Sequence, residues 1–221
     1  MKKLLLVIAL GVITATAAWA QVGIKAGVGF ATINEEGDDI SQDDIDNRSI
    51  VTPVLGLTFG INIADILTIQ PELLYSQSGG SNTYTLLGAV TKNSYRINYL
   101  ELPVLAKLQF GNANQDGIGV HIAAGPWIGY ALNGKRTTKT TRDDTVLFDV
   151  EDKFTFDDQD NAERINYGMI GAAGVSFGNV VVDLRYNYGL NNLLDNDADN
   201  TNDTKPVLQT HNIALTLGMT F

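Results

Sequence analysis

The chain contains no cysteine and only two histidines, His121 and His211. Disulfides are therefore excluded, as is lipid attachment through a processed N-terminal cysteine. Nucleophilic catalysis has few candidates, because histidine is the side chain whose ordinary pKa lies near neutral pH. Basic residues are also scarce, with 15 Lys and Arg against 25 Asp and Glu. This balance argues against nucleic acid as a partner, because phosphate contacts require clustered Lys and Arg.

Long hydrophobic runs are absent beyond the first twenty residues. The one apolar stretch, residues 4–13, follows Lys2 and Lys3 and precedes the small residues Ala18 and Ala20. This order is typical of a secretory signal peptide and predicts cleavage after Ala20. The alternative, a membrane-spanning helix, requires about 20 consecutive apolar residues.

The predicted mature chain is acidic and has the size of one domain. Residues 1–20 are expected to be the signal peptide and residues 21–221 the outer-membrane domain. Removing Lys2 and Lys3 with the signal leaves 13 basic residues against 25 acidic ones, a net charge of −12. If this domain crosses a membrane, it must form a closed barrel, because only helices and closed barrels satisfy every backbone group in lipid.

Apolar residues recur at every second position in eight segments, and this period of two indicates β-strands with two unlike faces. The last segment shows the pattern clearly, with large apolar side chains at the odd positions from Ile213 to Phe221. Many such segments in an exported chain are typical of a transmembrane β-barrel. The predicted strands are residues 22–33, 50–63, 67–78, 94–110, 118–132, 165–177, 180–190 and 207–221.

The predicted connections alternate between long and short. Outer-membrane barrels have short periplasmic turns and longer outer loops, and an even strand number puts both termini at the periplasmic end. The long connections hold 20 of the 25 acidic residues. The short connections are residues 64–66, 111–117 and 178–179, and the long ones are 34–49, 79–93, 133–164 and 191–206. The sequence therefore predicts an all-β fold, an eight-stranded antiparallel up-and-down transmembrane β-barrel.

The two faces of the predicted strands favour a membrane barrel over a soluble one. In residues 118–132, large apolar side chains alternate with a face that includes Gly119, His121 and Trp127. A soluble lipocalin-like barrel would turn its large apolar face inward, around a ligand. Here the face opposite the large apolar residues carries Gly, Thr, Asn and charges, which predicts a narrow polar lumen.

Aromatic side chains fall into two groups by height along the threaded strands. Amphipathic rings favour the lipid–water boundary, so two girdles are predicted. A general preference of aromatics for strands would not sort them by height. The group at the long-loop end is Tyr75, Tyr95, Tyr99, Trp127, Tyr130, Tyr167, Tyr186 and Tyr188, and the group at the short-turn end is Phe110, Phe177 and Phe221.

Four prolines lie inside the predicted strands, where each removes a hydrogen bond from a ladder that has no free edge. One interpretation is that some of them mark β-bulges, which would reverse the in/out parity locally. The prolines are Pro53, Pro71, Pro103 and Pro126.

Four segments resemble the PorT-like outer-membrane β-barrel proteins, a porin-family group common in Bacteroidota. They are QPELLYS at 70–76, YLELP at 99–103 continuing to Lys107, AGPWIGY at 124–130 and DLRYNYG at 183–189. The resemblance implies an eight-stranded barrel in the outer membrane of a Gram-negative bacterium. It also implies that prolines inside the strands are a common feature of the family. It implies little biochemistry, and a role in protein secretion is not carried over.

Strand parity places six charged side chains on the lumen face, three basic and three acidic. Buried charges persist only when paired, and an eight-stranded barrel is just wide enough for side chains to fill it. A salt-bridge network that plugs the barrel is therefore predicted, with Glu72 and Lys107 as a pair, and the alternative is a gated pore or proton path. The six residues are Lys25, Glu72, Glu101, Lys107, Asp183 and Arg185.

Two further features have functional interpretations. His211 beside Thr210 at the outer rim would suit a lipid-modifying enzyme, although no serine partner can be identified. Residues 195–200, DNDADN, resemble a calcium loop, but Asn200 stands where an EF-hand needs Gly and Pro206 where it needs Glu. No catalytic residue, cofactor or metal ligand is assigned, and weak calcium binding by the acidic loops remains open.

The sequence thus predicts a monomeric outer-membrane barrel, not an enzyme, with a structural or surface-interaction role, a plugged lumen and long acidic outer loops. The alternatives are a narrow channel for ions or very small solutes and a lipid-modifying membrane enzyme. Expected partners are outer-membrane lipid and lipopolysaccharide, the barrel assembly machinery and an extracellular loop partner. Phe221 is the expected assembly signal, because terminal aromatics are commonly recognised in the barrels that this chain resembles.

Overall fold

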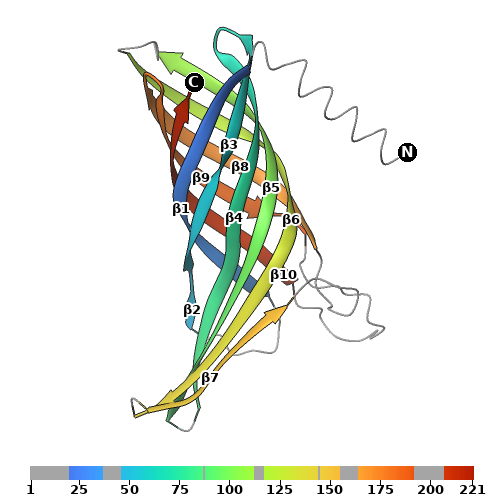
Figure 1. Cartoon of the computed structure of the whole chain (residues 1–221), viewed down its shortest axis with the longest axis vertical. Coiled ribbons are helices and arrows are strands. Elements are labelled where there is room, and N and C mark those ends of the chain that lie inside the picture. Colours follow the sequence, from blue (N-terminus) through green and yellow to red (C-terminus); the bar gives the residue numbers. More distant parts are fainter. Residues whose placement is uncertain are drawn as a thin grey trace, which may run out of the picture.

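The structure, a computed structural model, describes residues 20–36, 46–86, 88–111, 117–143, 145–154, 164–191 and 207–221. Antiparallel pairing closes eight of its ten strands into a barrel, in the order β1–β3–β4–β5–β6–β8–β9–β10 and back to β1 (Figure 1). The strands are β1 (Ala20–Glu36), β2 (Asp46–Arg48), β3 (Ile50–Ala64), β4 (Leu67–Leu86), β5 (Ala89–Gly111), β6 (Ile118–Arg142), β7 (Thr145–Phe154), β8 (Ile165–Phe177), β9 (Val180–Gly189) and β10 (Val207–Thr220). The predicted eight-stranded antiparallel barrel is confirmed.

Barrel strands that follow one another in the chain also pair with one another, so the topology is up-and-down. β1 closes the barrel with β10 through a register that begins at Gly23 opposite Thr220, so the C-terminus lies at the short-turn end (Figure 1, top). Gly178 opens the two-residue turn between β8 and β9 with φ +54°, a conformation that glycine adopts at little cost. Among the described residues, no helix is long and apolar enough to cross a membrane.

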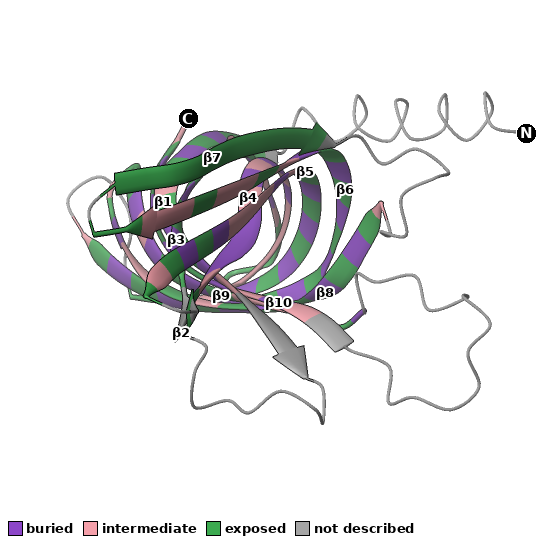
Figure 2. Ribbon diagram, turned by 90° about the horizontal axis from the view of Figure 1, so that it is seen from below, coloured by how far each residue is buried: buried purple, intermediate pink, exposed green. Residues whose placement is uncertain are grey.

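Inward and outward side chains alternate along most of the barrel wall, and one register shift interrupts the alternation on β6, where Leu132 and Asn133 are both exposed. In β6, Ile118, Val120 and Ile122 are exposed on the outside, whereas Gly119 and His121 are buried in the lumen. Figure 2 shows this alternation as stripes along β5 and β6, seen from the long-loop end. The prediction that the large apolar face points outward is therefore confirmed.

The interpretation of strand prolines as β-bulges is wrong. The pairing of β4 with β5 stops after Pro71–Val104 and resumes at Leu74–Glu101 in the same register. The pairing of β5 with β6 likewise resumes in register beyond Pro103. Each proline lacks the backbone N–H that would donate a hydrogen bond to the neighbouring strand, but the chain stays extended there. Side chains therefore keep alternating between the inner and outer faces on both sides of the proline. The register shifts lie elsewhere, at Asn62/Ala64, Asn98/Tyr99 and Thr140/Thr141.

Two of the predicted long loops are strands over much of their length. Residues 79–93 complete β4 and β5, and residues 133–164 contain the end of β6 and all of β7. β2 pairs with β4 and β7 pairs with β6, so an open sheet β2–β4–β5–β6–β7 continues beyond the barrel at the long-loop end (Figure 1, bottom). We call this extension the loop sheet. Its strands lack the alternation of large apolar and polar residues that marks the barrel strands. Ser81, Thr91 and Asn93 on β4 and β5 are polar and buried, whereas β7 exposes the apolar residues Val146, Leu147, Phe148 and Val150.

Several predictions concern residues outside the described part of the chain. These are the signal segment up to residue 19, the calcium-like loop at 195–200 and most of the long connections at 34–49 and 191–206.

Candidate functional site: the barrel lumen

Three ion pairs cross the middle of the lumen. Lys25 Nζ on β1 lies 2.9 Å from Glu72 Oε1 on β4 and 2.8 Å from Asp183 Oδ2 on β9. Arg185 Nη1, also on β9, lies 2.7 Å from Glu72 Oε2. Each of these four side chains has at most 6% of its surface exposed. Charges this deeply buried require such partners, because an unpaired ion would carry a large desolvation cost.

His121 and Gln70 extend this group of charges. His121 Nε2 on β6 lies 2.6 Å from Asp183 Oδ1, and Gln70 Nε2 donates a 2.7 Å hydrogen bond to Glu72 Oε1. We call Lys25, Glu72, His121, Asp183 and Arg185 the lumen charge cluster. The sequence put His121 on the lumen face but gave no signal that it would contact Asp183, 62 residues away.

Two of the six predicted charges lie outside the lumen charge cluster. Glu101 accepts a hydrogen bond of 2.5 Å from Ser76 Oγ. Lys107 is buried, but within the described chain no carboxylate lies within ion-pairing distance of its ammonium group. The predicted pair of Glu72 with Lys107 is therefore wrong. Both carboxylate oxygens of Glu72 are taken by cations from β1 and β9, which reach it across the lumen.

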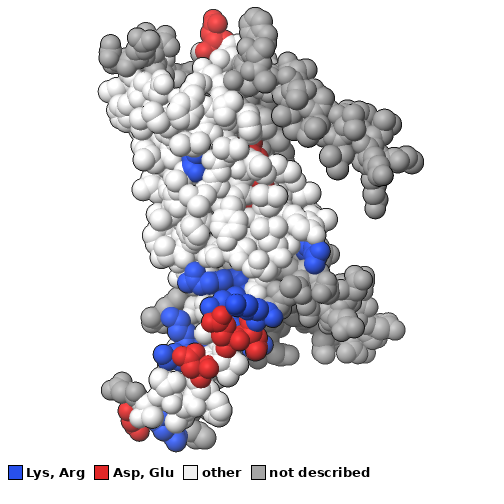
Figure 3. Space-filling model, in the orientation of Figure 1, with Lys and Arg blue, Asp and Glu red and all other residues white. Residues whose placement is uncertain are grey.

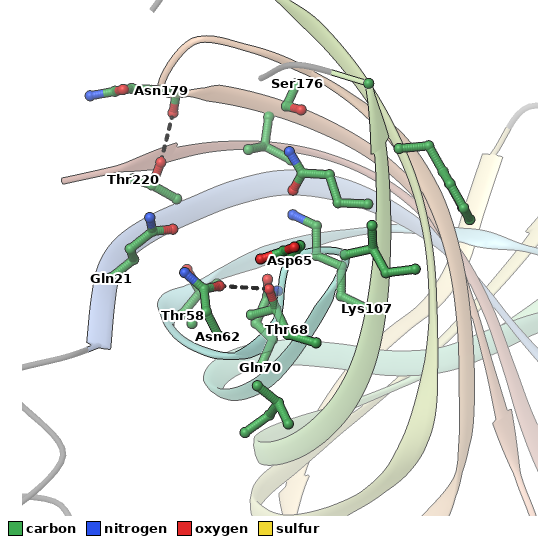
Figure 4. Close-up of a pocket in the computed structure, with 18 of the residues that line it drawn as sticks. Gln21, Thr58, Asn62, Asp65, Thr68, Gln70, Lys107, Ser176, Asn179 and Thr220 are labelled. Carbon is green, nitrogen blue, oxygen red and sulfur yellow. Dashed lines mark hydrogen bonds between the residues drawn. The ribbon is translucent and has the colours of Figure 1, made fainter. Parts of the chain in front are cut away.

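A polar cavity of about 1100 Å³ opens into the lumen at the short-turn end (Figure 4). Its wall carries amides and hydroxyls, including those of Gln21, Asn62 and Thr68. Lys107 and Gln70 also line it, and Gln70 contacts Glu72 of the lumen charge cluster. The cavity thus penetrates from one end as far as the charged layer.

Apolar and polar side chains together fill much of the lumen beyond the charged layer, the polar ones including Ser78, Asn166 and Asn212. The residues of three buried groups are Leu105, Ala123, Trp127 and Ile170; Val54, Leu74 and Ala214; and Ile97, Tyr99 and Ala131. A second cavity, lined by Ser78, Glu101 and Asn212 among others, has a volume of only about 10 Å³. That volume admits about one water molecule. The lumen therefore has no wide passage through the described residues.

The two aromatic girdles are present in part. Tyr130 and Tyr167 are 46% and 49% exposed on the outer face towards the long-loop end, and Phe177 and Phe221 are 49% and 69% exposed at the other end. Tyr99 and Trp127 were expected in the first girdle, but both are buried in the lumen. They occupy inward positions of β5 and β6. The prediction used only the position of each aromatic residue along its strand, and it was therefore wrong for these two.

The placement of His211 bears on the enzymatic alternative. Tyr186 Oη lies 2.9 Å from His211 Nδ1, and Tyr188 meets the imidazole edge-on with ring centroids 5.1 Å apart. Thr210 is 5% exposed and accepts a hydrogen bond from Asn166 in the lumen. Adjacent residues of a strand point to opposite faces, so Thr210 is not placed as a nucleophile for His211. Within the described ranges, no group of three or more His, Asp or Glu side chains is arranged to hold a metal ion.

An up-and-down barrel with an apolar outer wall, aromatic borders and a polar interior is typical of the class of outer-membrane β-barrels. The family described as "Outer membrane protein beta-barrel domain" matches residues 18–195, and the chain belongs to this family. It is therefore an outer-membrane protein. In this class the short turns generally face the periplasm and the longer loops face outward.

Similar solved structures include other outer-membrane proteins. Ail, the attachment invasion locus protein of Yersinia pestis, solved with the heparin analogue sucrose octasulfate, is 13% identical with a TM-score of 0.41, covering 91% of this chain and 99% of Ail. Neisserial surface protein A is 12% identical with a TM-score of 0.41 and the same coverages. OprG of Pseudomonas aeruginosa is 13% identical with a TM-score of 0.36, covering 91% and 96%. No curated protein sequence matches the chain.

Proposed function

We propose that this outer-membrane protein is a structural or surface-interaction barrel with a closed lumen, which anchors and presents the loop sheet at the cell surface. The observation that carries the proposal is the lumen charge cluster, in which Lys25 and Arg185 both bind Glu72 and so tie β1, β4 and β9 across the interior. Within the described part of the chain, Thr210 faces the lumen and is not placed as a nucleophile for His211, so the enzymatic alternative gains no support there. The segments that resemble PorT-like proteins lie on β4, β5, β6 and β9, which supports membership in that group as part of the proposal.

The energetics of the lumen charge cluster support the proposal of a closed lumen. Moving Glu72 aside to open a path would leave Lys25 and Arg185 without a carboxylate that each contacts at 2.7 to 2.9 Å. Breaking a buried pair by removing one partner typically costs about 3–5 kcal/mol. An open state would have to offset this cost, so spontaneous opening is expected to be rare.

Planar-bilayer recording of the mature protein tests this proposal. Folded protein, verified by heat-modifiable gel migration before reconstitution, is expected to show no steady conductance after insertion. A stable open conductance from the parent protein would overturn the closed-lumen proposal and favour a channel.

A narrow channel for ions or very small solutes is the second candidate, and the cavity at the periplasmic end favours it. That cavity already reaches Lys107 and Gln70, so a path through the lumen would need to breach only the lumen charge cluster and the apolar layer beyond it. In the same recordings, this candidate predicts a conductance that rises when Lys25→Met and Glu72→Gln are combined, because the pair between them is removed.

A further inference from the structure

Lys107 is a buried cation that faces a cavity without a counterion. It is 9% exposed, and its side chain extends from β5 into the cavity of about 1100 Å³ at the short-turn end (Figure 4). Within the described chain, its ammonium group makes no ion pair and no hydrogen bond. A buried ion without a partner carries a large desolvation cost, which a bound anion would offset.

The charges of the lumen charge cluster balance one another without Lys107. Lys25 Nζ contacts the carboxylates of Glu72 and Asp183. The guanidinium of Arg185 contacts Glu72 as well. Two cations thus meet two carboxylates, so neither carboxylate is left over as a counterion. Lys107 therefore adds one positive charge to this part of the lumen.

Two other carboxylates do not neutralise this charge. Glu101 stands six residues away on β5, which is about 20 Å along the strand, and it accepts its hydrogen bond from Ser76. Asp65 lines the cavity from the turn between β3 and β4, but it is exposed, so water and salt screen its charge. An anion held deep in the cavity is therefore attracted by Lys107 more strongly than Asp65 repels it.

Hydrogen-bonding side chains from the adjacent strands lie at the level of Lys107. Asn62 on β3 pairs with Thr68 on β4, and Thr68 pairs with Lys107. Thr68 Oγ1 donates a 2.8 Å hydrogen bond to Asn62 Oδ1, which leaves the amide NH₂ group of Asn62 to donate to a ligand. Gln109 lines the cavity two residues beyond Lys107, on the same face of β5. Its side-chain amide makes no hydrogen bond to another described residue.

We propose that this cavity binds a small organic acid, a monocarboxylate that also carries hydroxyl groups, with Lys107 as the charged group of the site. Lysine supplies a single point charge, which suits one carboxylate. A doubly charged phosphate ester is matched better by the forked donors of arginine, and the described cavity wall contains no arginine. Hydroxyl groups of the ligand can both donate to and accept from the amides of Asn62 and Gln109.

The size and position of the cavity fit a soluble ligand of this kind. Pockets that hold small molecules commonly measure about 300–1,000 Å³, so the volume at the short-turn end is sufficient. That end generally faces the periplasm in this class, so the ligand is a solute of the periplasm. Binding requires no passage through the lumen. The inference therefore goes beyond the proposed closed-lumen role, and its test is independent of the bilayer recordings.

Solution NMR of the isotope-labelled mature protein in neutral detergent micelles, titrated with gluconate at low chloride concentration, tests this proposal. Gluconate combines a carboxylate with hydroxyl groups, sorbitol has the hydroxyl groups without the carboxylate, and acetate has the carboxylate alone. Saturable shifts are expected at the backbone amides of Lys107, Gln109 and Thr68. Gluconate is expected to bind at least about tenfold more tightly than sorbitol or acetate, because each of these lacks one kind of contact.

Lys107→Met is expected to weaken gluconate binding by at least about tenfold, because the charge-assisted hydrogen bond is lost. Lys107→Arg, which keeps the charge, is expected to retain saturable binding. Lys153→Met is the matched control, since it removes one exposed cation from β7 of the loop sheet. Most Lys and Arg on the face drawn in Figure 3 lie towards that end of the molecule, away from the cavity. This control is expected to bind gluconate like the parent.

Heat-modifiable gel migration verifies that each variant is folded before it is titrated. If Lys107→Met failed this check, Gln109→Leu would test the same cavity, because it removes an uncharged amide from the wall. It is expected to weaken gluconate binding by about threefold, the effect of one neutral hydrogen bond.

Four results would overturn the proposal. They are no saturable binding of gluconate by the folded parent, equal affinity of the parent and Lys107→Met, sorbitol binding as tightly as gluconate, and displacement of gluconate by an equal concentration of chloride, which would indicate a site for simple inorganic anions.

Discussion

His121 and Asp183 meet across an intervening strand: His121 Nε2 on β6 lies 2.6 Å from Asp183 Oδ1 on β9, although β8 runs between them. The residue of β8 that pairs with both is Gly174. A Cβ atom at Gly174 would lie 2.5 Å from Asp183 Oδ1 and 2.6 Å from His121 Cε1. The contact therefore requires a glycine at this point of β8.

We predict that Gly174→Ala destabilises the folded barrel by about 1–3 kcal/mol, because the new methyl group must displace the His121–Asp183 contact or the backbone beside it. Gly171→Ala is the matched control, since a Cβ atom there would meet nothing within 4 Å. The measurement is the free energy of unfolding from urea titrations in lipid vesicles. Equal stability of the two variants would contradict the prediction.

Lys25 and Lys107 provide a second matched pair, because both are buried lumen lysines but only Lys25 contacts carboxylates. Lys25→Met is expected to lower the free energy of unfolding by about 3–5 kcal/mol, since Glu72 and Asp183 each lose a partner. Lys107→Met is expected to change it by less than about 1 kcal/mol. The same urea titrations measure both, and a larger loss at Lys107 would show that the ion pairs of the structure are misassigned.

The coupling between Lys25 and Glu72 is expected to appear in a double-mutant cycle. Glu72→Gln alone should lower the free energy of unfolding. The double variant Lys25→Met/Glu72→Gln should lower it by about 0.5–3 kcal/mol less than the two single changes added together. Additive effects would mean that the two residues do not interact in the folded barrel.

Deletion of Phe221 is expected to impair assembly in the outer membrane. Phe221 N donates a 2.8 Å hydrogen bond to Val22 O at the seam between β10 and β1, and its ring is 69% exposed on the lipid side. Phe177→Ala is the control, because it removes another exposed aromatic at the same end of the barrel. Yield and heat-modifiable migration of membrane-fraction protein measure assembly. If the deletion matched the parent in both, Phe221 would not be the assembly signal.

The mature protein is expected to begin at Gln21, because Ala18 and Ala20 supply the small residues that signal cleavage requires. Intact mass of the protein extracted from membranes measures this directly. Retention of residues 1–20 would contradict it.

The strands of the barrel could be predicted from sequence because each has one face in lipid. The strand predicted at 165–177 has the same bounds as β8, and that at 50–63 differs from β3 by one residue. The loop sheet could not be predicted in this way. Residues 79–93 and 133–142 are largely polar on both faces, so no apolar alternation marks them as strands. β7 carries the consecutive apolar residues Val146, Leu147 and Phe148 in place of an alternation.

The sequence predicted which charged residues line the lumen, but it did not predict which of them form ion pairs with each other. Parity put Lys25, Glu72, Asp183 and Arg185 on the inner face, where the structure places them. The alternation of strand faces also put Tyr99 and Trp127 on the inner face. The girdle prediction ignored this alternation and used only their position along the strands. Similar depth on two adjacent strands did not identify the partner of Glu72. A side chain in the lumen can contact residues from any strand of the surrounding barrel.

The sequence by itself determined the alternating faces, the number of barrel strands and the charge of the lumen, because these depend on side-chain chemistry at a period of two. Only the closed tertiary structure decided which charges meet. Closure brings β1, β4, β6 and β9 around one axis, so the partners of Lys25 lie 47 and 158 residues away in the chain. Those separations depend on the register of every intervening strand pair, which no local pattern encodes.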